Sequence, residues 1–143
     1  MTGLVTASSW KSNMDIDNYI QQIKTLRAEA DLLEEDAPGA VMRKINLLTH
    51  AHMLMGRVSA HMDGDYAKVY AYRKIKYAQA QAEAKKGQKG YAGELAVADL
   101  RMAEAQAQAL KTFWNNEFRS LREYIYELRL RVRVDMNTLG GGD

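Results

Sequence analysis

The chain has 143 residues, one proline, no cysteine and a formal net charge of +2. Its length suits one domain with a modest core. The absence of cysteine excludes a disulfide framework, a thiolate nucleophile and a zinc–thiolate site. Abundant alanine, the best helix former, favours an all-helical fold. Neither a signal peptide nor a membrane-spanning stretch is recognisable, so we expect a cytoplasmic protein.

The charge is unevenly distributed along the chain. Residues 1–67 carry six Lys and Arg against nine Asp and Glu, whereas residues 68–143 carry fourteen against nine. This asymmetry suggests a second half that faces a polyanion and a first half that meets either a basic partner or the chain's own basic half. Ordinary solvated helix faces would explain the same pattern.

The first predicted helix spans about 15–35 and follows a flexible N-terminal segment, residues 1–14. Asp15 is a suitable N-cap, and apolar residues then recur at intervals of three and four from Ile16 to Leu33. Acidic residues crowd the C-terminal end, at positions 29–36, where carboxylates oppose the helix dipole. Another interaction should therefore hold these carboxylates in place.

Two further helices are predicted at about 38–62 and 65–86. Pro38 is tolerated in a first helical turn, Gly64 is placed for a left-handed C-terminal turn, and Asp65 is placed to cap the next helix. A glycine-rich segment, residues 86–93, is predicted to be a loop that turns the chain back.

The fourth predicted helix, about 94–137, is unusually long and precedes a flexible tail, residues 138–143. Its apolar seam repeats nearly every 3.5 residues. Residues 128–134 also alternate as a strand would, but we assign them to the helix because a lone strand would lack a partner. Such a helix spans roughly 65 Å, more than the other helices cover. The expected fold is therefore an all-α hairpin or bundle, in one domain, that forms a homo-oligomer.

The sequence contains no recognisable catalytic signature. The three histidines lack metal-ligand spacing, the serines have no nucleophile context, and the glycines follow no phosphate-loop pattern. Asp63 and Asp65 are explained by helix capping rather than by a cation loop. We therefore expect no enzyme activity, no metal and no cofactor.

A basic and aromatic stretch, residues 70–90, is the first candidate surface. Cations beside flat rings suit single-stranded nucleic acid, because Lys and Arg neutralise phosphates while bases stack on the rings. Tyr66, Tyr70, Arg73 and Tyr77 fall on or near one face of the predicted helix. Alternatively, these tyrosines are half-buried core residues with solvated lysines around them. The candidate nucleic-acid-binding residues are Arg73, Lys74, Lys76, Lys85, Lys86, Lys89, Tyr70 and Tyr77.

An arginine-rich stripe along the fourth helix is the second candidate surface. It contains Arg119, Arg122, Tyr126, Arg129 and Arg133 at helical spacing. Arginine favours carboxylate or phosphate partners, so Arg129 or Arg133 could equally pair with the acidic end of the first helix or with an adjacent subunit. The predicted partner or oligomer interface comprises Trp114, Phe118, Leu121, Ile125, Leu128, Val132, Arg122, Arg129 and Arg133.

The order of these features resembles the recombination mediator proteins of T-even-like phages, the UvsY type. The likeness covers about residues 65–135: Arg73 and Lys74, a glycine-broken loop, central Trp114, and a distal amphipathic segment. It implies a ring-forming, non-enzymatic helical protein that binds single-stranded DNA and contacts the recombinase and the single-strand-binding protein. In the resemblance, Arg73 and Lys74 match the paired basic residues, and Trp114, Phe118 and the segment through Val132 match the assembly region.

The chain departs from that family one turn beyond the basic pair. It has Ala78 and Ala80 where the family has further cations. The sequence therefore leaves open whether DNA is contacted directly. The expected function is that of a phage accessory protein of DNA recombination or replication, with recombinase loading as its role. The alternative is a helical protein-interaction module, such as a phage inhibitor of a host or defence protein, or an assembly factor.

Overall fold

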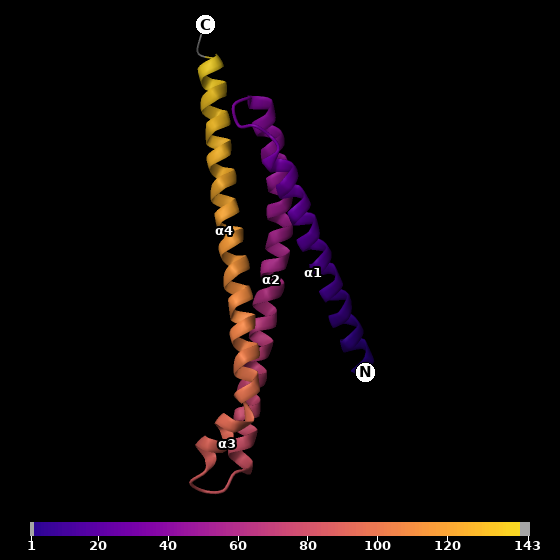
Figure 1. Ribbon diagram of the computed structural model, residues 1–143, viewed down its shortest axis with the longest axis vertical. Helices are drawn as coiled ribbons and strands as arrows, with labels where there is room; N and C mark the ends of the chain where they lie inside the picture. The colour runs from indigo at the N-terminus through magenta and orange to yellow at the C-terminus, as the bar shows by residue number, and fades with distance from the viewer. Residues whose placement is uncertain (1, 141–143) are drawn as a thin grey trace. The chain divides into compact units, whose positions relative to one another are not determined.

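The computed structural model describes residues 2–140, and their side chains from Asp15 to Thr138. Within this range the chain is helical and has no strand (Figure 1). The predicted all-α class is confirmed, including the long C-terminal helix. The helices are α1 (Thr2–Asp31), α2 (Pro38–Glu83), α3 (Lys89–Ala96) and α4 (Ala98–Gly140).

The chain divides into two compact units. Unit 1 contains Met1–Ser59 and Asn115–Asp143, and unit 2 contains Ala60–Trp114. Both α2 and α4 run from one unit into the other, so this division does not decide whether the chain is one domain. The single domain stays a prediction.

Unit 1 holds most of the buried apolar side chains. They come from α1, the first part of α2 and the second part of α4, and they recur at intervals of three and four residues, so each helix turns one stripe inward. Burial of these stripes is the main stabilising contribution. The buried apolar residues of unit 1 are Ile16, Ile23, Ala30, Val41, Ile45, Leu48, Ala51, Leu54, Met55, Val58, Leu121, Ile125, Leu128 and Val132.

The predicted break at Gly64 is wrong, because α2 continues through it to Glu83. A glycine inside a helix costs only about 1 kcal/mol relative to alanine. The apolar residues also keep the same helical spacing on both sides of Gly64, from Val58 and Met62 to Tyr66. Asp65 therefore does not cap a helix; its carboxylate lies 3.1 Å from Nε2 of His61, one turn earlier.

Other helix ends also differ from the predictions. The helix α1 begins at Thr2, inside the segment expected to be flexible, and ends at Asp31 rather than near residue 35. At the C-terminus, α4 extends to Gly140, and the rest of the predicted flexible tail, residues 141–143, lies outside the described residues. Residues 128–134 belong to α4, which confirms the helical assignment.

The predicted loop at 86–93 is partly helical. The chain reverses at residues 84–88, where Gly87 has a φ of +89°, a left-handed conformation that favours glycine. The short helix α3 then begins at Lys89, and an interruption at Val97 separates it from α4. The predicted single helix from residue 94 is therefore two helices.

Unit 2 has a thinner core than unit 1. Met62 and Val97 are its buried apolar side chains among the described residues. Half-buried residues on α2 and α4 repeat with a near-heptad spacing, which is the pattern of two helices that pack along one seam. Those half-buried residues are Tyr66, Val69, Arg73, Tyr77 and Ala80 on α2, and Leu100, Glu104, Ala107, Lys111 and Trp114 on α4.

Candidate nucleic-acid interface

Two tyrosines one turn apart on α2 form the centre of the candidate surface. The rings of Tyr66 and Tyr70 have centroids 6.1 Å apart. Each ring carries a lysine ammonium: Nζ of Lys111 lies 4.6 Å from the centroid of Tyr66, and Nζ of Lys74 lies 4.7 Å from that of Tyr70. Tyr70 is 37% exposed and Tyr66 is half-buried. Residues from α2 and α4 therefore build one cation–aromatic surface in unit 2.

A second cation–aromatic pair lies on a different side of α2. Nζ of Lys76 is 5.5 Å from the ring centroid of Tyr72, which is 50% exposed. Two residues apart on a helix means a rotation of about 200°, so Tyr72 and Tyr70 point in nearly opposite directions. The predicted residues Lys74 and Lys76 thus belong to separate surfaces.

Arg73 is turned toward the seam of unit 2 rather than toward solvent. Its side chain is 18% exposed and forms an ion pair with Glu104, which is 16% exposed. Nη2 of Arg73 also lies 3.5 Å from the second carboxylate oxygen of Glu104. A phosphate would have to compete with this carboxylate, so Arg73 is poorly placed for the DNA contact predicted for it.

Tyr77 packs beneath α3. Its ring lies so close to the backbone of Gly93 that a β-carbon added there would be 2.6 Å from Cε2 of the ring. The half-buried Tyr77 therefore has a packing role, which agrees with the alternative left open for the tyrosines. Lys85, Lys86 and Lys89, by contrast, are exposed at the chain reversal and the start of α3.

Sequence reasoning missed three members of this region: Tyr72, Glu104 and Lys111. Lys111 had a detectable signal, since it follows Ala107 by four residues and precedes Trp114 by three, which is the spacing of the seam itself. The side chain of a lysine at such a position extends until its ammonium reaches the edge of the seam, where it can form a cation–π contact with a tyrosine ring.

Four residues of the predicted oligomer interface are core residues of their own chain. Leu121, Ile125, Leu128 and Val132 are between 0% and 7% exposed and face the inside of unit 1. They are not available to a second copy in this arrangement, because the chain's own helices already cover them. Trp114 is half-buried and meets Phe113 edge to face, with centroids 5.4 Å apart.

Phe118 also contacts its own chain. Its ring stacks on His52 of α2, with centroids 4.0 Å apart and planes 13° apart. Nε2 of His52 lies 3.1 Å from the carbonyl oxygen of Phe118. Burial lowers the pKa of His52, the carbonyl opposes this effect and nearby Arg122 adds to it. His52 is therefore favoured in its neutral form in the folded protein.

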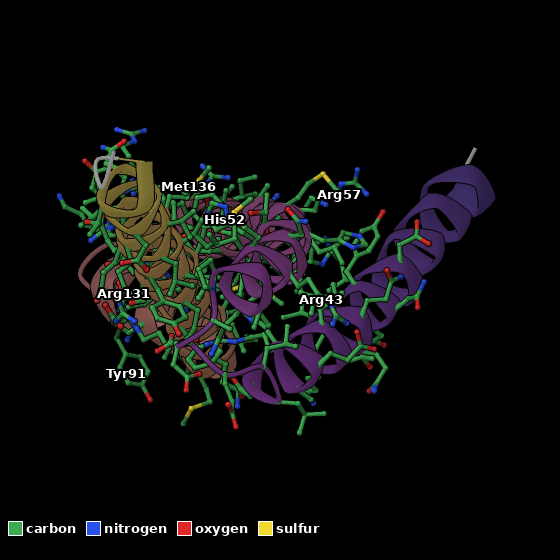
Figure 2. The ribbon with its side chains drawn as sticks, turned by 90° about the horizontal axis from the view of Figure 1, so that it is seen from above. Arg43, His52, Arg57, Tyr91, Arg131 and Met136 are labelled. Carbon is green, nitrogen blue, oxygen red and sulfur yellow. The ribbon has the colours of Figure 1, made fainter. Side chains whose placement is uncertain are left out.

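Other polar contacts in unit 1 link α1 to its neighbours. Nη1 of Arg57, a side chain labelled in Figure 2, lies 3.4 Å from the hydroxyl oxygen of Tyr19. The guanidinium lies 5.4 Å from the ring centroid of Tyr19. Nη1 of Arg27 on α1 lies 3.2 Å from a carboxylate oxygen of Glu117 on α4. These exposed pairs contribute little stability each.

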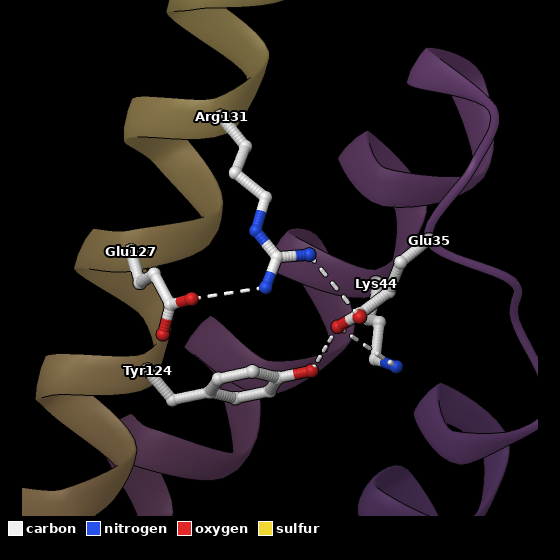
Figure 3. Close-up of polar contacts among 5 residues, drawn as sticks. All are labelled: Glu35, Lys44, Tyr124, Glu127 and Arg131. Atoms are coloured by element: carbon white, nitrogen blue, oxygen red, sulfur yellow. Dashed lines mark hydrogen bonds and ion pairs between the residues drawn. The ribbon is translucent and has the colours of Figure 1, made fainter.

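A polar cluster fixes the connection between α1 and α2 (Figure 3). The carboxylate of Glu35 accepts hydrogen bonds from the Tyr124 hydroxyl and from Nη1 of Arg131, the latter at 3.2 Å. The buried Lys44 ammonium lies 3.6 Å from the same carboxylate, and Nη2 of Arg131 donates to Glu127 at 2.9 Å. This cluster shows what holds part of the acidic segment, and Arg131 takes the role expected of Arg129 or Arg133.

The Glu35 cluster predicts a specific loss of stability in acid. The Tyr124 hydrogen bond, together with Arg131 and Lys44, lowers the pKa of Glu35 despite partial burial. A carboxylate with a lowered pKa in the folded state stabilises it above the unfolded pKa, and this contribution disappears as the pH falls through the folded pKa. We expect the stability gap between wild type and Glu35→Gln to be full at pH 6 and to shrink toward pH 3.

Denaturant unfolding of both proteins across this pH range measures the gap. The matched control is Glu34→Gln, because Glu34 is exposed and makes no described ion pair or hydrogen bond. Its unfolding should follow wild type at every pH. A wild-type advantage over Glu35→Gln that stays constant down to pH 3 would contradict the prediction.

Within the described side chains there is no group of three or more His, Cys, Asp or Glu that could hold a metal ion. No described helix is long and apolar enough to cross a membrane. Comparison with known proteins found no matching family model, no matching curated protein and no matching solved structure.

Proposed function

We propose that this chain binds single-stranded DNA through the cation–aromatic surface formed by Tyr66, Tyr70, Lys74 and Lys111. One observation carries the proposal: two neighbouring rings of α2 each bear a lysine ammonium, one from α2 itself and one from α4. Single-strand binders use the same two components, rings for the bases and cations for the backbone.

Binding would exchange partners within this surface. A base that stacks on Tyr70 takes the ring face that Lys74 covers, and the displaced ammonium becomes free to meet a phosphate. Each cation–π contact that is lost is worth about 0.5–1 kcal/mol at an exposed site. Stacking of a base on the ring contributes about 1–3 kcal/mol and therefore offsets this loss. The exposed Lys85, Lys86 and Lys89 supply further charge for a strand that continues along unit 2.

The resemblance to recombination mediators adds a biological role to this proposal. A non-enzymatic helical protein that holds a single strand could help a recombinase to replace the single-strand-binding protein there. The proposed DNA binding does not require Arg73, because Glu104 forms an ion pair with its guanidinium.

The double variant Lys74→Ala/Lys111→Ala should weaken binding to a fluorescent oligonucleotide about tenfold at low salt. Loss of two phosphate contacts should also flatten the dependence of log K on log salt by about 1.4, at roughly 0.7 per contact for single strands. Fluorescence anisotropy over a salt series measures both quantities.

Two controls make this test specific. Lys24→Ala removes an exposed cation from α1 in the acidic half, and it should leave affinity and salt slope unchanged. Tyr70→Leu keeps an apolar side chain but removes the ring, and should weaken binding without changing the slope. If wild type does not bind the oligonucleotide at low salt and micromolar concentration, the proposal fails.

A protein-interaction module is the second candidate function. Its support is the exposed apolar surface of unit 2, where Tyr91 and Leu95 on α3 are 73% and 64% exposed and Met102 on α4 is 66% exposed. Co-purification with and without nuclease separates the candidates: a stoichiometric protein that survives nuclease favours the module, and partners lost with nuclease favour DNA binding.

A further inference from the structure

The second part of α4 has two apolar faces, and its own chain covers one of them. The covered face contributes Leu121, Leu128 and other residues to the core of unit 1. On the opposite face, Tyr126, Leu130 and Val134 follow one another at intervals of four residues and are 60%, 39% and 60% exposed. We call Tyr126, Leu130 and Val134 the outer stripe.

The outer stripe borders a shallow hollow of about 310 Å³. Leu130 and Val134 line it, together with Glu127, Arg131 and Asp135. Residues four apart form a ridge on a helix, and ridges of this kind pack into the equivalent grooves of another helix. The shape of this face therefore suits a second helix.

Charges of opposite sign lie on the two sides of the outer stripe. At 100° per residue, Arg122, Arg129 and Arg133 fall on one side. Glu123, Glu127 and Arg131 fall on the other side or near the centre, and the charge of Arg131 is already paired with Glu127 and Glu35. Arg129 and Arg133 make no ion pair with the described residues, so their charges are available.

These charges select a partner and an orientation. In a two-fold pair of parallel helices, the arginine side of one copy faces the acidic side of the other. In an antiparallel pair each side faces its equivalent, so arginine would face arginine. We propose that a second copy of this chain docks on the outer stripe, α4 against α4 in parallel, in a self-complementary contact. This interface goes beyond the proposed DNA binding and uses none of its residues.

Leu130→Asp tests the contact itself, by light scattering and sedimentation over a concentration series. Wild type is expected to reach a dimer or a larger assembly, and Leu130→Asp to remain a monomer with unchanged helicity. The matched control is Met53→Asp, which places the same charge at a 53% exposed methionine of α2 and should associate as wild type does. A monomeric wild type at about 100 µM, or a Leu130→Asp variant that still associates, would overturn the proposal.

The absence of native cysteine allows a clean test of orientation. Tyr126→Cys and Val134→Cys are oxidised separately and as an equimolar mixture. Parallel helices place position 126 level with position 126 of the second copy, so each variant should form a disulfide dimer by itself. Antiparallel helices place position 126 level with position 134, so a dimer that forms only in the mixture would refute the parallel arrangement.

Exchanging two adjacent charges tests whether the charges beside the outer stripe select the parallel orientation. Arg122→Glu alone or Glu123→Arg alone puts like charges opposite each other, and each should weaken association about fivefold. The double variant Arg122→Glu/Glu123→Arg keeps the net charge and restores opposite signs across the pair, so association should recover. If the double variant associates as weakly as the single variants, the arginine side of one copy does not face the acidic side of the other.

Discussion

Replacing Leu128 by alanine is expected to lower the free energy of unfolding by about 2–5 kcal/mol, as deletion of a fully buried leucine does. Leu128 is 0% exposed in the core of unit 1, whereas Leu130, two residues later, is 39% exposed on the outer face. Leu130→Ala should therefore cost about 1 kcal/mol or less. The two leucines are matched in chemistry and helix and differ in the face that they occupy.

This pair also separates a helix from a strand at residues 128–134. A strand places positions 128 and 130 on the same face, since its side chains alternate with period two, and would make both substitutions costly or both mild. Urea unfolding at low protein concentration, where the proposed self-association is absent, measures both values. Equal costs for the two variants would contradict the helical assignment.

Gly93→Ala is expected to destabilise unit 2 by about 1–3 kcal/mol, the usual cost of forcing extra volume into a packed site. The added methyl group would lie 2.6–2.9 Å from three carbons of the Tyr77 ring. The ring is rigid, so it has to move or α3 has to lift from α2. Thermal unfolding should show the loss, and amide exchange should rise in α3.

Gly90→Ala provides the control within the same helix. No atom lies within 4 Å of a β-carbon placed at Gly90, and alanine is the better helix former by up to about 1 kcal/mol. This variant should be neutral or slightly stabilising. If Gly93→Ala behaves like Gly90→Ala, Tyr77 does not pack against α3 as described.

The sequence was sufficient for those features that depend on a long, regular pattern. The seam of α4 repeats over many turns, and the buried residues Leu121, Ile125, Leu128 and Val132 lie on it. The sequence did not reveal what covers this seam. A 3.5-residue repeat fits a second subunit as well as the chain's own α1 and α2, and the pattern is the same in both cases.

Single-residue signals were less reliable than the periodic ones. Gly64 was expected to end a helix. The apolar residues continue past it at helical spacing, and their burial outweighs the cost of one glycine in a helix. The residues predicted for the DNA surface are divided between different sides of α2 for a similar reason. Arg73 and Lys74 are neighbours in sequence and both lie over the ring of Tyr70, yet only tertiary packing shows that Glu104 also engages Arg73.

The ion pair between Arg73 and Glu104 has a consequence for how unit 2 assembles. A slip of α2 along α4 by one heptad would move Arg73 away from Glu104, its partner in the seam of unit 2. A slip of that size would leave both half-buried charges without partners, which is far more costly than an exposed mismatch. This pair therefore favours the observed alignment of α2 and α4 over one that is shifted along the seam.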